Sequence, residues 1–319
     1  MIDIKTDNFL INKEVNKNLE SILERKIFSN GYIFYGPESI GKKQTAIQFI
    51  KEIFNQYSSN INIEKKIIDN NHPDFLLIEP TYVFKGNLIN RSEAEPSKSN
   101  KETIRIEQIR NIKKFLGHKS IESDKKIVLI VDAHLLNEAA SNCLLKTLEE
   151  PTNGLFILLT SNLNLILDTI ISRCQLIRFK SFSNKQLEIF VMNHSDSSIS
   201  ETDKELNLKD LISSSNGSPG KILNNIKIWN ELPNEIKDSL EFPLSDNLEI
   251  LKISKKISEE LEIDKQIFLI NLVQRKCWRK TQNKNIIKKL EDLKKHLKSL
   301  IQPRLAWEVT LLNIALEDL

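Results

Sequence analysis

The chain has 319 residues, more than a single hydrophobic core usually organises, so we expect two or three domains. Apolar residues make up 40% and charged residues 28% of the sequence, and these values exclude wholesale disorder. The 46 basic and 43 acidic side chains leave a net charge of +3, so any attraction to nucleic acid must come from a local patch.

The cysteine content and the absence of long apolar runs indicate the compartment. Cys143, Cys174 and Cys277 are far apart and odd in number, which favours reduced thiols over a disulfide framework or a zinc site. No apolar run reaches the roughly 18 residues of a membrane span. The opening MIDIKTDNFL carries acidic side chains in place of a basic stretch followed by an apolar one. We therefore expect a cytoplasmic protein with no membrane contact.

The first half of the chain predicts an α/β fold. The apolar and aromatic run 32–35 is stopped by Gly36 and Pro37, and the pattern at 45–54 is helical. Two further apolar runs, IVLIV at 127–131 and LFILL at 155–159, are typical of buried strands. Because short apolar runs separated by helices are characteristic of parallel sheets, we expect one here.

Helices and loops are predicted between and after these strands. Apolar residues fall on one face of a helix at 138–150, which Pro151 helps to end. The polar, aperiodic stretch 82–101 predicts a long, exposed and poorly ordered loop. Ser183, followed three residues later by Gln186, fits a capping box that opens a helix.

Everything beyond residue 183 has a helical pattern, interrupted by the turn-rich stretch 213–220 and by Pro233 and Pro243. An apolar stripe near the end has the spacing of one helix face, and lysines flank it. It predicts either a helix that docks on partner subunits or an ordinary bundle helix with a solvated lysine face. The stripe consists of Ile286, Leu290, Leu293, Leu297 and Leu300.

The segment GPESIGKK, from Gly36 to Lys43, matches the phosphate-binding pattern GxxxxGK[ST] except at its last position. In a working loop, glycines such as Gly36 and Gly41 let backbone N–H groups wrap the phosphates, a lysine such as Lys42 reaches the terminal phosphates, and the final hydroxyl holds Mg²⁺. Protonated Lys43 cannot bind Mg²⁺, so we expect poor hydrolysis and weak ATP binding at best. A chance glycine-rich turn is the alternative, which the strand before it and the helix after it disfavour.

A second element of a hydrolytic site is incomplete. The strand at 127–131 runs into Asp132 and Ala133, where hydrolysing enzymes of this class commonly carry an acidic pair. Asp132 retains one carboxylate for a metal, but Ala133 has none with which to orient or deprotonate a water. Taken alone, Asp132 is equally typical of a turn residue at a strand end.

Four further motifs give the chain a family resemblance. The stretch 137–151 (NEAASNCLLKTLEEP) resembles the signature helix of bacterial clamp-loader subunits, and Ser172-Arg173-Cys174 matches their second signature. His72-Pro73-Asp74 and the closing 303–308 (PRLAWE) are also similar. LLKTLEEP alone fits any amphipathic helix, and SRC alone occurs by chance. The order and spacing of all four motifs, which span nearly the whole chain, are specific. We identify the chain as resembling the AAA+ clamp-loader family of DNA polymerase III, specifically its delta-prime branch.

This resemblance implies an AAA+ architecture: a RecA-like parallel-sheet domain at 1–180 with a degenerate phosphate loop, a helical lid at 181–232 and an all-helical collar at 233–319. It also implies that Arg173 acts as an arginine finger in the ATP site of a neighbouring motor subunit. A guanidinium suits that task because it stays charged and directs two donors onto phosphate oxygens. A surface ion pair is the alternative role for Arg173. Cys174 has no neighbouring base, which favours packing over nucleophilic chemistry.

Several departures from the motor subunits bear on function. The lid motif at 217–221 (GSPGK) lacks the arginine with which motor subunits sense nucleotide, and residues 51–71 lack the four cysteines of the zinc module found in many relatives. We therefore carry over no metal. Residues 160–162 resemble the first sensor, whose polar groups would here cap or pack.

The resemblance implies a ring subunit that does not hydrolyse ATP and that helps to load a sliding clamp onto primed DNA within a polymerase holoenzyme. Its expected partners in a five-subunit hetero-oligomeric ring are the tau or gamma motors, the delta subunit, the clamp and primer-template DNA, which it would contact through salt-sensitive phosphate contacts. No cofactor is required. The alternatives are an active ATPase of the same fold, either a motor subunit or a DNA-repair enzyme, and a helical interaction module with a relic nucleotide fold.

Overall fold

The structure is a computed structural model of the chain that describes residues 12–56, 63–84, 87–90, 102–150, 154–194, 204–238, 246–299 and 302–316. Residue contacts divide the chain into two compact units, 1–182 and 183–319. The division expected at 232/233 stays a prediction, because the second unit holds every helix from residue 184 onward. Among the described helices, none has the length and apolar character needed to cross a membrane.

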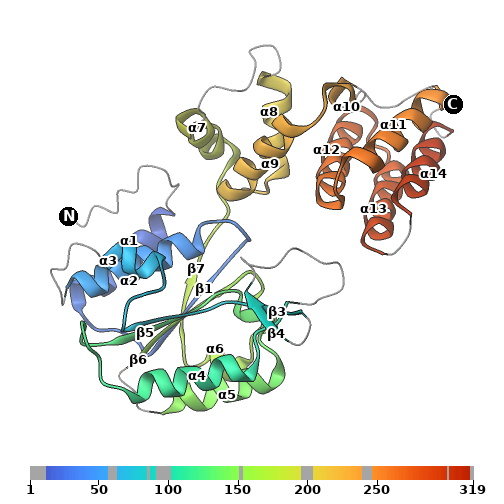
Figure 1. Cartoon of the computed structure of the whole chain (residues 1–319). Helices are drawn as coiled ribbons and strands as arrows, with labels where there is room; N and C mark the ends of the chain where they lie inside the picture. The colour runs from blue at the N-terminus through green and yellow to red at the C-terminus, as the bar shows by residue number, and fades with distance from the viewer. Residues whose placement is uncertain are drawn as a thin grey trace. The chain divides into compact units, whose positions relative to one another are not determined.

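The first unit is built on a five-stranded sheet in the order β2-β5-β6-β1-β7, with every neighbouring pair parallel (Figure 1). Every residue of β5 and β6 is buried, which explains the continuous apolar runs in the sequence. The strands predicted at 32–35, 127–131 and 155–159 are confirmed to within about a residue, as β1, β5 and β6. The bounds are β1 Gly31–Tyr35, β2 Phe75–Ile78, β5 Lys126–Ile130, β6 Gly154–Thr160 and β7 Gln175–Arg178.

Helices cover both faces of this sheet. Helices α1, α2 and α3 lie on one face and α4, α5 and α6 on the other (Figure 1). The predicted helix at 45–54 is confirmed and begins earlier, at Lys42, while α5 matches the predicted helix at 138–150 and is capped by Asn137, whose side chain accepts from Ala140 N at 2.8 Å. Pro151 lies outside the described residues. The bounds are α1 Lys13–Arg25, α2 Lys42–Asn55, α3 Ile63–Ile68, α4 Ile106–Gly117, α5 Glu138–Glu149 and α6 Asp168–Ile171.

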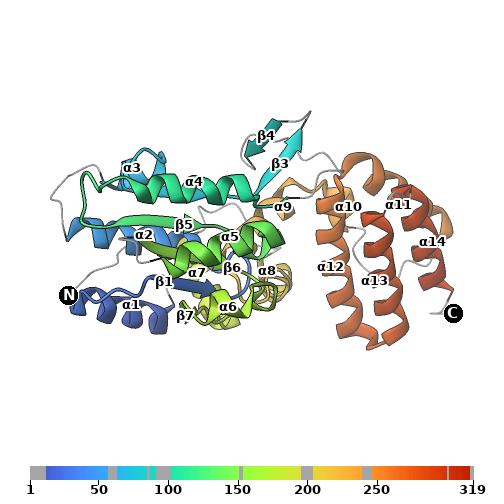
Figure 2. The same cartoon turned by 90° about the horizontal axis from the view of Figure 1, so that it is seen from below.

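The predicted loop at 82–101 is wrong for its first part. Strands β3, Thr81–Phe84, and β4, Asn87–Asn90, form an antiparallel hairpin (Figure 2). Thr81 and Thr103 also exchange backbone hydrogen bonds of 3.1 and 3.2 Å, which anchor the hairpin next to α4. Four-residue strands are too short for their alternation to stand out from the sequence, and this tertiary pairing is invisible in it. Residues 91–101 lie outside the described part of the chain.

In its described residues, the second unit is entirely helical. The predicted capping box is confirmed, because Ser183 N donates to Gln186 Oε1 at 2.9 Å and Gln186 N donates to Ser183 Oγ at 3.4 Å. The interruption predicted at 213–220 is narrower, since α8 ends at Ser214 and α9 begins at Pro219. The bounds are α7 Asn184–His194, α8 Lys204–Ser214, α9 Pro219–Glu231, α10 Asn234–Asp238, α11 Asn247–Glu260, α12 Ile263–Thr281, α13 Lys284–Lys298 and α14 Pro303–Ala315.

The C-terminal helices form a bundle with its own core. Helix α13 packs against α12 and α14, and its apolar stripe is buried there at Ile286, Leu290, Leu293 and Leu297. Trp307 of α14 is fully buried, and its indole N–H donates to Gln266 Oε1 at 2.9 Å. The stripe therefore serves this bundle, as the bundle-helix alternative predicts. Leu300 lies outside the described residues.

Candidate functional site

The turn after β1, where the sequence predicts a phosphate-binding loop, contains two glycines with positive φ. Gly36 has φ +153°, and a Cβ added there would lie 2.3 Å from the carbonyl oxygen of Phe179. Gly41 has φ +102° and immediately precedes the first residue of α2. The N–H of Gly36 donates to Thr160 O at 3.2 Å, tying the loop to the end of β6. This geometry favours glycine at both positions, because side chains rarely adopt these φ values.

Lys42 is folded back onto this loop. Its Nζ donates to the carbonyl oxygens of Gly36 at 2.7 Å and Pro37 at 2.6 Å, and only 7% of the residue is exposed. Two of the three N–H donors of the ammonium are thus engaged by the loop itself.

Lys43 occupies the position where the loop pattern calls for a hydroxyl. Its Nζ lies 2.6 Å from Oε1 of Glu79, the residue after β2. Mg²⁺ needs hard oxygen ligands in near-octahedral geometry, but this position offers an ammonium, and the carboxylate of Glu79 already pairs with it. The residues present therefore do not fit a magnesium ion held in the usual way. The sequence analysis did not identify Glu79 as the partner of Lys43.

The end of β5 supplies one carboxylate and no second one. Asp132 adopts a left-handed backbone conformation, with φ 50° and ψ 48°, at the turn into a short 3₁₀ helix that begins at Ala133. Ala133 is fully buried in the core. A longer acidic side chain at this position would have to displace packed neighbours.

His134, which the sequence did not single out, links this turn to the end of β6. Its Nδ1 lies 3.4 Å from Thr160 Oγ1, and its Nε2 lies 3.4 Å from Ser161 Oγ. Asn162, at the expected sensor position, accepts from Asn164 N at 3.2 Å and so caps the turn that follows. The polar groups of this segment bond to the protein itself, as expected for capping and packing roles.

Arg173 lies at the opposite edge of the sheet from the phosphate loop. Strands β7 and β1 are parallel with Tyr32 opposite Gln175, so Arg173 precedes β7 at its amino end while Gly36 follows β1 at its carboxyl end. By this register Gly36 is level with Phe179, six residues beyond Arg173, so the two are separated by roughly 20 Å along the strand direction. Arg173 therefore does not join Gly36, Gly41, Lys42, Lys43 and Asp132, which the fold gathers around the carboxyl edge.

The guanidinium of Arg173 is held by three neighbours and remains accessible. One terminal nitrogen donates to Thr169 O at 2.9 Å and to Ser172 Oγ at 3.5 Å, and the other donates to Glu149 Oε1 at 2.6 Å. The side chains of Arg173 and Glu149 are 38% and 45% exposed. Since a guanidinium has five N–H donors, these three contacts leave donors for a further acceptor. Glu149 ends the LLKTLEEP helix, so the two sequence signatures meet at this corner.

Cys174 packs against the sheet. Its Sγ would lie 2.6 Å from a Cβ added to Gly31, and it borders the main core cluster. Burial raises the pKa of the thiol to about 11, so the thiolate needed for nucleophilic attack is scarce near neutral pH. The structure therefore agrees with a packing role.

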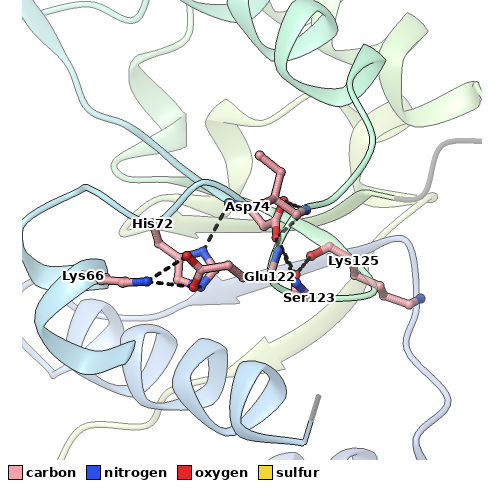
Figure 3. Close-up of polar contacts among 7 residues, drawn as sticks. Lys66, His72, Asp74, Glu122, Ser123 and Lys125 are labelled. Atoms are coloured by element: carbon pink, nitrogen blue, oxygen red, sulfur yellow. Dashed lines mark hydrogen bonds and ion pairs between the residues drawn. The ribbon is translucent and has the colours of Figure 1, made fainter. Parts of the chain in front are cut away.

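The HPD motif organises a loop at the amino edge of the sheet (Figure 3). Asp74 is fully buried, and its carboxylate accepts from the backbone N–H groups of Ile121, Glu122 and Ser123 at 2.7 to 3.0 Å. The hydroxyl of Ser123 also donates to it at 3.2 Å. One carboxylate thus fixes three consecutive backbone donors of the loop before β5.

His72 extends this network toward α3. Its Nδ1 accepts from Asp74 N at 3.2 Å, and its ring stacks on Phe54 with the centroids 4.2 Å apart. Burial lowers the pKa of His72, and the charge of Glu122 partly opposes that shift. Glu122 in turn accepts from Lys66 of α3 at 2.7 and 2.8 Å (Figure 3). Within the described ranges, no three His, Cys, Asp or Glu side chains are grouped to share a metal ion.

The strand order, the glycine loop between β1 and α2 and the following helical unit define an AAA+-type P-loop fold. Sequence comparison then gives the family. The family model described as "DNA polymerase III, delta subunit" matches residues 11–183, more than half of the chain, and the chain belongs to this family. A second model, described as "Cyanobacterial DNA polymerase III delta prime, C-terminal domain", matches residues 191–314.

Curated relatives support the clamp-loader resemblance. The chain is 30% identical over 180 residues to DNA polymerase III subunit delta' of Bacillus subtilis, a match that covers 54% of this chain and 49% of that protein. It is 30% identical over 176 residues to subunit tau of the same organism, covering 55% and 29%. It is 40% identical over 82 residues to the Haemophilus influenzae delta' subunit, covering 25% of each. The chain thus matches about half the length, or less, of these relatives.

Among solved structures, a DNA polymerase III gamma subunit-related protein from Thermotoga maritima is similar with a TM-score of 0.49 and 16% identity, covering 94% of this chain and 98% of that one.

Proposed function

We propose that this chain is the delta-prime subunit of a bacterial clamp loader, a ring member that does not hydrolyse ATP and that supplies Arg173 to the ATP site of a neighbouring motor subunit. The observation that carries this proposal is the position of Arg173, an accessible guanidinium on the far side of the sheet from the chain's own phosphate loop. At that distance it cannot serve a nucleotide bound by its own chain.

The carboxyl edge of the sheet supports the same proposal. Hydrolysis needs a metal held between a loop hydroxyl and a carboxylate, and it needs a group that orients water. Lys43 is paired with Glu79 at the hydroxyl position, and the buried Ala133 offers no carboxylate. We therefore propose that nucleotide binding by this chain is weak or absent and that no cofactor is required.

The proposed role of Arg173 in the neighbouring ATP site follows from the chemistry of phosphoryl transfer. As charge builds on the phosphate oxygens, an arginine supplied by the next subunit stabilises the transition state and contributes about 10³ to 10⁵ in kcat. The proposed partners are tau or gamma motors, the delta subunit, the sliding clamp and primer-template DNA, in a five-subunit ring. The proposed outcome is loading of the clamp onto primed DNA during replication.

An active motor of the same fold is the second candidate, and the 30% identity to a tau subunit favours it. That alternative predicts Mg²⁺-dependent ATP turnover by the purified chain, abolished by Lys42→Ala. The geometry around Lys43 and Ala133 argues against it.

The test is a reconstituted ring with wild-type or Arg173→Ala chain. The phosphate loops of all motor sites except the neighbouring one are disabled, so that the DNA-stimulated ATPase rate reports a single site. We expect Arg173→Ala to lower its kcat by about 10³-fold or more, with ring stoichiometry by native mass spectrometry unchanged.

Arg25→Ala is the matched control, because Arg25 is an exposed arginine in the last turn of α1. It should leave the rate unchanged. Equal rates for wild type and Arg173→Ala in an intact ring would refute the finger and favour a passive interaction module.

A further inference from the structure

A hollow of about 600 Å³ opens between α8, α12 and α13 of the second unit. Helix α12 presents one face to it, at positions spaced i, i+3, i+4, i+7 and i+8. On a bundle helix, residues with this spacing are ordinarily apolar and buried against a neighbour. Here they are polar, cationic and aromatic: Asn271, Gln274, Arg275, Trp278 and Arg279.

Trp278 is the aromatic wall of this hollow. It is 45% exposed, whereas the chain's other two tryptophans, Trp229 and Trp307, are 5% and 0% exposed. An indole with an accessible face beside a cavity is suited to stack on another planar group, and a nucleotide joins a planar base to a negatively charged phosphate.

Three cations line the same hollow as the indole: Arg275, Arg279 and Lys294. Arg279 lies 2.5 Å from the buried Asp210 of α8, and Lys294 of α13 lies 2.7 Å from Glu291. Arg275 donates instead to the neutral side-chain oxygen of Asn216 at 3.0 Å. These groups therefore leave one positive charge that neither carboxylate balances.

The electrostatics of Arg275 point in the same direction. Burial lowers the pKa of its guanidinium, the neighbouring charge of Arg279 lowers it further, and Asp210 partly opposes both effects. An anion placed between the two arginines would relieve this repulsion, and a phosphate can accept from two guanidinium groups at once.

We propose that this hollow binds single-stranded nucleic acid, with a base stacked on Trp278 and an adjoining phosphate bound by Arg275 and Arg279. Its volume lies within the range of small-molecule pockets and accommodates a nucleotide unit. An acidic peptide would meet the same charge but would make no use of the exposed indole. This site is separate from the phosphate loop and from Arg173, so the inference does not depend on the proposed function.

The test uses the full chain and a short oligothymidylate. Binding is followed by anisotropy of a fluorescein label and, with unlabelled oligonucleotide, by quenching of tryptophan emission. Because the other two tryptophans are buried, we expect quenching to come from Trp278. Trp278→Ala should weaken binding by about tenfold and abolish quenching, while Trp278→Phe should abolish quenching and retain most of the affinity.

Arg275→Ala tests the phosphate contact. It should weaken binding and reduce the slope of log K against log salt by about 0.7, the value for one phosphate contact to a single strand. Lys252→Ala, which removes an exposed cation of α11, is the charge-matched control and should leave both quantities near wild type. Thermal melts of all variants establish that they are folded.

Three results would overturn the proposal. One is binding that is unaffected by both Trp278→Ala and Arg275→Ala. Another is equal affinity and equal quenching with polyglutamate, which would assign the hollow to acidic peptides. The third is the absence of any oligothymidylate binding by a folded wild-type chain at low salt.

Discussion

The amino and carboxyl edges of the parallel sheet each carry an exposed ion pair. The two pairs have the same length, and they differ in where on the sheet they stand. At the carboxyl edge Lys43 pairs with Glu79, and at the amino edge Arg173 pairs with Glu149, both at 2.6 Å. Exposed pairs of this kind contribute little to stability. The first nevertheless stands where a metal ligand is needed, whereas the second leaves guanidinium donors accessible. This difference underlies the proposal that the chain does not hydrolyse ATP itself and that Arg173 acts on a neighbouring subunit.

The largest expected effect on stability comes from the buried support of the amino edge. Asp74→Asn replaces a carboxylate that accepts from three backbone N–H groups with an amide that has one acceptor oxygen. We expect the free energy of unfolding to fall by about 3 kcal/mol, because buried donors are left unpaired. Thermal denaturation should show a drop in Tm of about 6–12 °C.

Asp69→Asn is the control, since Asp69 is exposed and close to Asp74 in sequence. A change of Tm as large as that of Asp74→Asn would show that charge, not the buried hydrogen bonds, is responsible. This pair of variants tests whether the buried hydrogen bonds of Asp74 hold the loop before β5 in place.

A smaller effect is expected from restoring the missing hydroxyl. Lys43→Thr provides a magnesium ligand and releases Glu79, so we expect Mg²⁺-dependent tightening of ATP binding of about tenfold by calorimetry. ATP hydrolysis should stay undetectable, because Ala133 still supplies no carboxylate.

Lys43→Ala, which removes the cation without adding a hydroxyl, separates the two contributions. If it tightens Mg-ATP binding as much as Lys43→Thr does, the cation alone blocks the site. ATP turnover by Lys43→Thr would contradict the expectation, because it would show that hydrolysis at the carboxyl edge needs no second acidic residue.

The smallest effect is expected at Glu149. Glu149→Gln removes the charge from the pair with Arg173 but keeps a hydrogen-bond acceptor, and Thr169 O still holds the guanidinium. In the single-site ring assay we expect kcat to change less than about threefold, because exposed pairs are weak. A loss as large as that of Arg173→Ala would instead make Glu149 an essential positioning residue.

Much of the nucleotide-fold half was predictable from the sequence because its signals are local. Strands β1, β5 and β6 are continuous apolar runs because both sheet faces are covered, and the glycine loop must lie between β1 and α2. The hairpin of β3 and β4 was not predicted, because such short strands are determined by the strand with which each one pairs and not by a local sequence pattern. Lys43 and Ala133 were visible in the sequence, but the partner Glu79 was not, because 36 residues separate it from Lys43.

The sequence by itself determined the family, the phosphate-loop pattern with its altered last position and the candidate finger, because these depend on residue type and local spacing. Only the tertiary structure decided that Arg173 lies at the sheet edge opposite the loop and pairs with Glu149, and that α8, α12 and α13 enclose a cationic hollow beside Trp278. The physical reason is that edges, ion pairs and cavities are formed by residues distant in the chain. Their proximity is set by strand direction and helix packing.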